Sequence, residues 1–238
     1  MKFKHVFLIG VGGTGSHLVD PLVRLLTHHP EGTTNITIVD GDAYETSNEN
    51  RQVFDSELMG ENKAVATAKR LKHPNIRAVD AFIDAEKFKK LLINTVQKDS
   101  SFLVISAVDN HATRHALISS LDDEGYTDFT FISPGNSYAH GQVVVYAKEK
   151  GIPLTTHPFN KYEEMRVPPD RIPEPGNGCA YQVVSTPQLI TANASAALGA
   201  LWTVSAMLDH NGWFEELHFD CFKMKLVSQG AAKGLLAV

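Results

Sequence analysis

The stretch HVFLIGVGGTGSHLVDPLVRLL, residues 5–26, decides the fold of this chain. Residues 5–9 form an apolar run with the length and composition of a short buried strand. Residues 14–27 carry leucines at helical spacing, although Pro21 allows a kink or a later helix start. A glycine-rich turn between a strand and a helix usually binds a phosphate, because glycine lets the backbone approach the ligand and the helix N-terminus presents N–H donors. The stretch therefore predicts a nucleotide-binding strand–turn–helix unit.

The rest of the sequence extends this unit into an α/β pattern. The strand-like runs are residues 35–40, 76–83, 101–108 and 128–136, and the helical patterns between them are 62–71, 85–96 and 110–121. Such alternation predicts a Rossmann-like, mostly parallel sheet with helices on both faces. Later segments predict antiparallel strands on the C-terminal side: a strand over 138–149, a long helix over roughly 188–210, and a closing hairpin. Residues 151–187 are rich in Pro and Gly, and this long crossover loop is either functional or partly disordered.

The glycine turn by itself leaves the nucleotide open. Gly10, Gly12 and Gly15 satisfy the GxGxxG spacing, with Gly13 inside the turn. Asp40 ends the second strand-like run, where an acid that binds a ribose is expected. NAD, FAD and ATP all fit this combination.

Three polar residues after the second strand favour a triphosphate. Asn48, Arg51 and Lys63 place an amide and two cations where the phosphates are expected. A dinucleotide pyrophosphate is normally held by backbone N–H groups, whereas a triphosphate carries more charge and benefits from Arg and Lys. A solvated charged loop is the alternative interpretation for Arg51.

Asp109 follows the fourth strand-like run, at the edge where open α/β sheets bind ligands. A carboxylate that faces a triphosphate suits Mg²⁺, which prefers one or two carboxylates together with phosphate oxygens. The alternative is that Asp109 caps the helix that opens at Asn110. Both roles are compatible with one side chain.

These motifs, in this order, resemble the ThiF/MoeB/HesA family, which includes the adenylation domains of ubiquitin-activating enzymes. The resemblance rests on GVGGTGS, IVDGD, SNENRQ, the lysine of GENK, and SAVDNHATR, and it covers roughly residues 5–148, with weaker likeness after residue 186. Compact chains of this kind are similar to ThiF-like proteins encoded on mobile genetic elements. The resemblance implies one adenylation domain over residues 1–238 and a homodimer, in which the small-residue helix at 192–208 packs against its partner.

The resemblance also implies an activity. Such proteins are ATP-dependent adenylyltransferases that activate the C-terminal carboxylate of a small ubiquitin-like or sulfur-carrier protein as an acyl-adenylate. No general base is needed, because a carboxylate is already ionised at neutral pH and catalysis is mainly positioning and charge neutralisation. By matching position, the ribose ligand is Asp40, the phosphate ligands are Asn48, Arg51 and Lys63, the Mg²⁺ ligand is Asp109, and the remaining ATP contacts are Gly10, Gly12, Gly13, Gly15 and Asn110. Arg114 fits the family's DNxxxR spacing but receives no role.

The cysteines and the chain start mark departures from the family. Cys179 ends the crossover loop, where some relatives use a cysteine to take the activated acyl group; an inert packed cysteine is the alternative. Cys221 is expected in the core. The chain has no CxxC motif, so no zinc is expected. The chain also begins close to the first strand. In relatives, a helix before that strand sends an arginine into the active site of the partner subunit, and this chain is expected to lack it. Either Arg166 or Arg171 takes the place of that arginine, or the activity is changed.

Bulk composition limits the partners and the location. The chain has 238 residues, 43% of them hydrophobic and 21% charged, and a formal net charge of −5. The negative charge argues against a nucleic-acid partner. The lack of a signal peptide, a membrane-length apolar segment and a disulfide framework predicts a cytoplasmic protein.

Two other functions stay open. An NAD(P)- or FAD-dependent oxidoreductase would explain the glycine turn and Asp40, but it would leave Arg51, Lys63 and the carboxylate after the fourth strand without a role. A non-catalytic scaffold that binds nucleotide or a ubiquitin-like partner would keep the fold, and the intact set of charged residues argues against lost catalysis.

Overall fold

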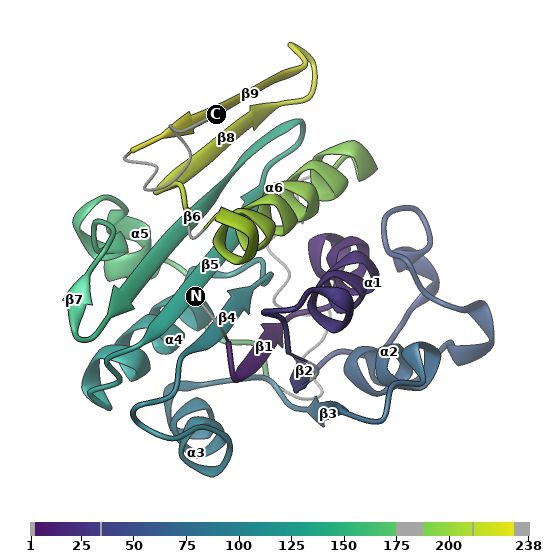
Figure 1. Cartoon of the computed structure of the whole chain (residues 1–238). Helices are drawn as coiled ribbons and strands as arrows, with labels where there is room; N and C mark the ends of the chain where they lie inside the picture. Colours follow the sequence, from purple (N-terminus) through teal and green to yellow (C-terminus); the bar gives the residue numbers. More distant parts are fainter. Residues whose placement is uncertain (1–2, 34, 175–187, 211, 231–238) are drawn as a thin grey trace.

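The computed structural model describes residues 3–33, 35–174, 188–210 and 212–230, and its strands join one sheet (Figure 1). The sheet order is β3-β2-β1-β4-β5-β6-β8-β9, with β7 paired to β6. The strands are β1 (His5–Ile9), β2 (Ile36–Asp40), β3 (Ile76–Asp80), β4 (Phe102–Ser106), β5 (Phe129–Asn136), β6 (His140–Glu149), β7 (Ile152–Pro153), β8 (Glu216–Asp220) and β9 (Lys225–Gln229). The α-helices are α1 (Gly13–His28), α2 (Lys63–Leu71), α3 (Ala85–Thr95), α4 (His111–Asp123), α5 (Glu163–Arg166) and α6 (Ile190–His210). Short 3₁₀ helices cover Thr46–Asn48 (η1), Ser56–Leu58 (η2) and Pro158–Asn160 (η3).

The parallel part of the sheet reverses its direction of growth at β1. The chain places β2 and β3 on one side of β1 and then crosses to place β4 and β5 on the other. All four of these strand pairs are parallel. The carboxyl ends of β1 and β4 therefore flank the switch point where open α/β sheets bind ligands.

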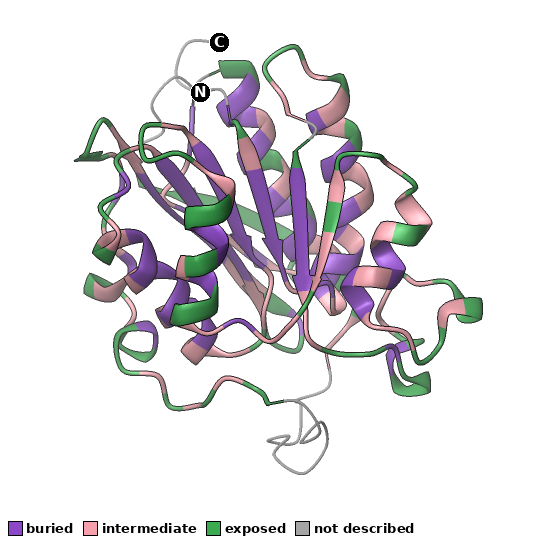
Figure 2. Cartoon of the chain, turned by 90° about the horizontal axis from the view of Figure 1, so that it is seen from below, coloured by how far each residue is buried: buried purple, intermediate pink, exposed green. Residues whose placement is uncertain are grey.

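Helices cover both faces of the sheet, because alternate side chains of each strand point to opposite faces. Leu8 of β1 and Ile105 of β4 pack with the apolar side of α1 and α6, whereas Phe7 and Val104 pack with α3 and α4. Figure 2 shows the strands as a buried layer between helices with exposed outer sides. The Rossmann-like α/β architecture is thereby confirmed.

The C-terminal side of the sheet is antiparallel, as the sequence predicts. Strand β6 runs antiparallel to β5 and β8, and β8 forms a hairpin with β9. Helix α6 crosses β6 closely at Gly199, where an added Cβ would lie 2.9 Å from a methyl group of Val143. The helix after the glycine turn continues through Pro21, so neither a late start nor a break occurs there. Among the described helices, none is both long enough and apolar enough to cross a membrane.

The described part of the crossover segment, residues 151–174, is more regular than a loop, because it holds β7, η3 and α5. It packs on α4: His157 lies 2.8 Å from a carboxylate oxygen of Asp122, and the ring of Phe159 stacks on His115 with centroids 4.9 Å apart. Cys179, the predicted acyl acceptor, lies outside the described residues.

Candidate functional site

The glycines between β1 and α1 divide into two groups. Gly10 has a φ of +89°, and a Cβ there would lie 2.8 Å from the carbonyl oxygen of Ala107. A Cβ at Gly15 would lie 2.0 Å from the oxygen of Gly10, and one at Gly13 would meet the side chain of Asn193. These three glycines allow close packing of the turn. Gly12, the N-cap of α1, faces open space except for the side-chain amide of Gln52, 3.8 Å away, so it is the glycine that leaves room for a ligand.

Asp40 ties the glycine turn to the end of β2. Its Oδ2 accepts a hydrogen bond from the Val11 N–H at 2.7 Å, and its Oδ1 accepts one from the Asp42 N–H at 2.9 Å. Each carboxylate oxygen keeps a second lone pair, which suits the hydroxyl groups of a ribose. Burial raises the pKa of Asp40 to about 6, although Lys63 and both N–H donors act in the opposite direction.

A pH dependence follows from the raised pKa of Asp40. The ordinary value is 3.8, so the folded protein binds this proton more tightly than the unfolded chain does. We expect this group to lower the free energy of unfolding as pH rises from about 4 to about 6, by up to about 3 kcal/mol. Urea unfolding of the wild type and of Asp40→Asn across this range measures the difference, since the variant lacks the titrating group. An NMR titration in which the Asp40 carboxyl carbon titrates near pH 4 would contradict the prediction.

Lys63 is a buried cation at the start of α2. Its side chain is 7% exposed, and its Nζ donates to Oδ2 of Asp42 at 3.2 Å. Asn62 caps the helix by accepting from the Val65 N–H, and its amide also donates to the main-chain oxygen of Asp40 at 2.8 Å. In the described part of the chain, Asp42 is the only hydrogen-bond partner of the Lys63 ammonium group, which leaves donors for an incoming anion.

The segment around Arg51 lies against the first turns of α1. His17 donates from Nε2 to the carbonyl oxygen of Arg51 at 3.0 Å, and the Val53 N–H donates to Oγ of Ser16 at 3.0 Å. Asn48 is buried, and its Oδ1 accepts from the Glu45 N–H at 3.1 Å. The structure therefore places this segment beside the glycine turn, although the two are more than 30 residues apart in sequence.

Among the residues that the structure describes, the hydrogen-bond acceptors of the Arg51 guanidinium group are neutral. It donates to the main-chain oxygen of Ser47 at 3.3 Å and to the side chain of Asn50 at 3.4 Å. No carboxylate of the described residues lies within 4.0 Å of it. The main chain of Arg51 thus lies beside the first turns of α1, and Lys63 lies close enough to Asp40 to act on its charge.

Asp109 is exposed between β4 and α4. The helix begins at His111 with Asn110 as its N-cap, because Oδ1 of Asn110 accepts from the Thr113 N–H at 2.7 Å. The alternative role of Asp109 as the helix cap is therefore wrong. Its carboxylate makes no hydrogen bond with the residues that the structure describes, so it can receive a cation.

The donor set around Asp109 suits Mg²⁺ bound together with phosphate. Across the described ranges, no group of three or more His, Cys, Asp and Glu side chains is placed to hold a metal. One carboxylate completed by phosphate oxygens and water matches the preference of Mg²⁺, which seldom occupies an all-protein cage. The predicted nucleotide contact of Asn110 stays a prediction, since its amide oxygen already caps α4.

The glycine turn after β1 and the turn that carries Asp109 after β4 lie next to each other. The Ala107 N–H donates to the main-chain oxygen of Ile9 at 2.8 Å, which sets the β4–α4 turn beside the glycine turn. The glycine turn, Asp40 and the turn that carries Asp109 therefore lie at one sheet edge. Of the two arginines considered as substitutes for a partner's arginine, Arg166 is paired with Glu163 in α5, and Arg171 is exposed.

Three residues of the site were missed by sequence reasoning. Asp42 is the partner of Lys63, and Asn193 of α6 fills the space beside Gly13. Gln52 approaches Gly12, and its Oε1 is buried without a hydrogen-bond partner among the described residues. Asp42 and Gln52 lie within the motifs IVDGD and SNENRQ, but only their spatial neighbours reveal their roles.

Comparisons with known proteins agree with this geometry. A family model described as "ThiF family" matches residues 1–219. The chain belongs to the ThiF family. Ubiquitin-like modifier-activating enzyme 5 of Culex quinquefasciatus is 34% identical over 131 residues, which is 49% of this chain and 30% of that protein. The ThiF chain therefore spans less than a third of that relative's length.

Solved structures share the fold. The crystal structure of E. coli MccB with ATP has a TM-score of 0.62 at 16% identity, covering 98% of this ThiF chain and 65% of that one. The E. coli tRNA N6-threonylcarbamoyladenosine dehydratase TcdA, in complex with AMP, has a TM-score of 0.53 at 16% identity, covering 85% and 87% of the two chains. At these identities the likeness concerns the architecture.

Proposed function

We propose that this ThiF-family chain is an ATP-dependent adenylyltransferase that activates the C-terminal carboxylate of a small ubiquitin-like or sulfur-carrier protein. One observation carries the proposal: the open Gly12, the cations of Arg51 and Lys63, and the exposed Asp109, which makes no hydrogen bond to the described residues, come from segments around the β1–β4 switch point. A dinucleotide oxidoreductase would need only the first of these. The nucleotides in the MccB and TcdA structures, ATP and AMP, are of the class that we propose here.

The proposed reaction needs positioning and charge neutralisation. A carboxylate oxygen of the substrate tail attacks the α-phosphorus of ATP, an O–P bond forms, the bond to the β-phosphate bridging oxygen breaks, and pyrophosphate leaves. Both reactants are anions, so Arg51 and Lys63 lower their repulsion. The first N–H groups of α1 at Gly12 approach the phosphates, and Asp40 orients the ribose. When ATP binds, the Lys63 ammonium group exchanges its hydrogen bond with Asp42 for one with a phosphate oxygen.

A magnesium ion fits the proposal through Asp109. When bound, Mg²⁺ would supply charge neutralisation of the triphosphate and would fix its conformation. Asp109 is the residue that would hold it, and Asn48 and Arg51 would contact the phosphates. The proposal includes Cys179 as a residue that takes the activated acyl group. The final acyl acceptor depends on which carrier protein is activated.

ATP–pyrophosphate exchange with purified candidate carriers tests the activity. We expect exchange of labelled pyrophosphate into ATP only when a carrier with a free C-terminal carboxylate is present. The matched control is the same carrier with its C-terminus amidated, which removes the nucleophile and leaves the fold unchanged. Tight NADH binding without ATP binding would overturn the proposal in favour of an oxidoreductase.

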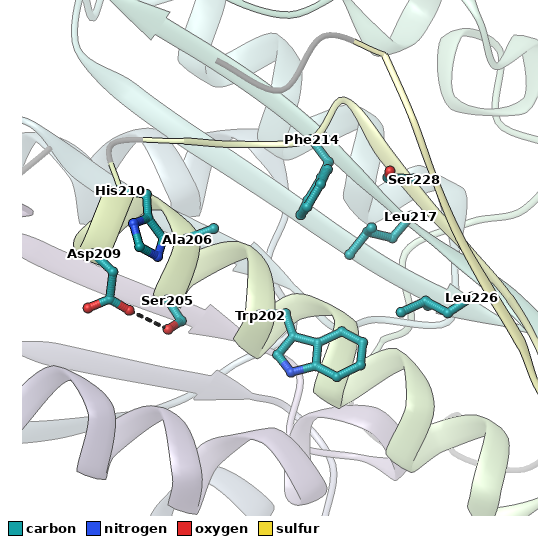
Figure 3. Close-up of a pocket in the computed structure, with 9 residues that line it drawn as sticks. All are labelled: Trp202, Ser205, Ala206, Asp209, His210, Phe214, Leu217, Leu226 and Ser228. Atoms are coloured by element: carbon teal, nitrogen blue, oxygen red, sulfur yellow. Dashed lines mark hydrogen bonds between the residues drawn. The ribbon is translucent and has the colours of Figure 1, made fainter. Parts of the chain in front are cut away.

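We also propose a homodimer, which the outer face of α6 supports. Leu198 and Trp202 are 43% and 45% exposed on this helix, and Trp202 lines a groove of about 390 Å³ with Leu226 of β9 (Figure 3). An antiparallel pairing of two α6 helices about Leu198 would bring Trp202 of each copy opposite the small Ala194 of the other. A two-fold interface requires such self-complementarity.

The substitution Trp202→Glu is expected to convert a dimer into a monomer, because it puts a charge into the centre of the proposed interface. Sedimentation equilibrium measures the mass. The control is Ile93→Glu on α3, an apolar side chain that is 59% exposed on the other side of the sheet, and it should leave the mass unchanged. A dimer mass for the Trp202 variant, or a monomer mass for the wild type, would remove this interface.

A further inference from the structure

Arg114 on α4 is a buried cation that no described function uses. The residue is 7% exposed, and no carboxylate of the described residues lies within 4.0 Å of its guanidinium group. Its Nε–H is buried and has no hydrogen-bond partner in the part of the chain that the structure describes. A buried charge is ordinarily paired and fully hydrogen-bonded, because removing it from water is costly.

Arg70 shows how a paired arginine looks in the same molecule. Its two terminal nitrogens donate to both carboxylate oxygens of Asp20, at 2.8 and 2.7 Å. Such a bidentate pair links α2 to α1 and stabilises the fold. Among the described residues, Arg114 has no equivalent bidentate partner. The carboxylates that act on its charge, Asp109 and then Asp170 and Glu164, lie farther than 4.0 Å away. A fold-stabilising ion pair therefore does not account for the charge at this position.

In the described part of the chain, the one hydrogen bond of the Arg114 guanidinium group goes to the β4–α4 turn. Its Nη2 donates to the carbonyl oxygen of Val108 at 2.6 Å. Val108 directly precedes Asp109, so this bond fixes the backbone from which the Asp109 carboxylate projects. Gly135 of β5 lies close to the same nitrogen, because an added Cβ there would be 3.4 Å from Nη2. The arginine is therefore held between α4, β5 and the turn.

The same turn is held from outside by the crossover segment. The Asp170 carboxylate accepts from the N–H groups of His111 and Ala112, at 2.9 and 2.7 Å. The backbone on both sides of Asp109 is thus fixed, by Arg114 from within and by Asp170 from without. Asp109 itself stays exposed and without a hydrogen bond to the described residues. This arrangement immobilises the main chain and leaves the carboxylate free.

We propose that Arg114 is a positioning residue for the metal-binding carboxylate of Asp109, acting through the carbonyl oxygen of Val108. The inference rests on the proposed function, because it presumes a divalent cation bound with ATP at Asp109. Groups that orient a metal ligand typically contribute 10- to 100-fold to metal affinity. Without the Val108 contact, the turn loses its internal support and the carboxylate samples positions in which it no longer faces the cation.

The test is the factor by which Mn²⁺, used in place of Mg²⁺, tightens the binding of α,β-methylene-ATP to the full chain. Isothermal titration calorimetry with and without the metal yields this factor. For Arg114→Met we expect the factor to fall by about tenfold, while the metal-free affinity stays within about twofold of the wild type. For Arg114→Lys we expect most of the factor to remain, because an ammonium group can donate to Val108 as well.

Arg70→Met is the matched control for folding. Breaking its bidentate pair should lower the melting temperature without changing the Mn²⁺ factor, whereas Arg114→Met should lower the melting temperature less. An unchanged Mn²⁺ factor in Arg114→Met would overturn the positioning role and leave the proposed function intact. An equal loss of metal-free affinity would overturn it too, since the charge would then attract the nucleotide directly. A wild type that binds no nucleotide would overturn both the inference and the proposed function.

Discussion

Replacing Asp109 with Asn is expected to reduce ATP–pyrophosphate exchange by about 10²- to 10³-fold. The amide keeps the size of the side chain but removes the charge that would hold Mg²⁺ against the triphosphate. The fold should be unaffected, because Asp109 is exposed and makes no hydrogen bond to the described residues, while Asn110 caps the helix. The measurement is carrier-dependent exchange at saturating ATP, with thermal melting as the test of folding.

The control for this prediction is Asp123→Asn at the other end of α4. Asp123 is exposed and pairs with Lys89 at 3.0 Å, far along the helix from the nucleotide site. A surface pair of this kind contributes little to stability, so exchange and melting should both match the wild type. Exchange by Asp109→Asn within about twofold of this control would exclude a metal-binding role for Asp109.

The second large effect separates two glycines of one motif. Gly15→Ala is expected to destabilise the protein by about 3 kcal/mol or more, because the new Cβ would lie 2.0 Å from the carbonyl oxygen of Gly10. Backbone rather than a flexible side chain occupies that space, so α1 must move away from β1. Urea unfolding should show a lower midpoint with an unchanged slope.

Gly12→Ala is the matched comparison, since it adds the same methyl group three residues earlier. The nearest atom to that group is the amide nitrogen of Gln52 at 3.8 Å, so stability should change far less than in Gly15→Ala. Nucleotide affinity should fall by about tenfold or more, because the methyl group occupies the open side of the turn that phosphates would approach. Equal destabilisation by both substitutions, or unchanged ATP binding in Gly12→Ala, would show that the motif serves only to pack helix on strand.

Local patterns of the chain were sufficient for the architecture. Apolar runs and helical spacing predicted the parallel strands β1 to β5, the antiparallel β6 and the closing hairpin, all of which the structure contains. The crossover segment was less predictable, because Pro and Gly suggest a loop. Its short helices depend instead on contacts such as the stacking of Phe159 on His115, which no local window reveals.

The sequence by itself determined the fold class, the glycine turn and the charged residues at the ends of strands, because the alternation of strands and helices and the motifs within it are local patterns along the chain. Only the tertiary structure showed which neighbours these residues contact. It assigned the helix cap to Asn110 rather than Asp109 and separated Gly12 from the glycines that serve packing. It also buried Arg114 with no carboxylate of the described residues within 4.0 Å. The physical reason is that these roles depend on packing and hydrogen bonds in three dimensions, as between Gly13 and Asn193, which lie on different helices and far apart in sequence.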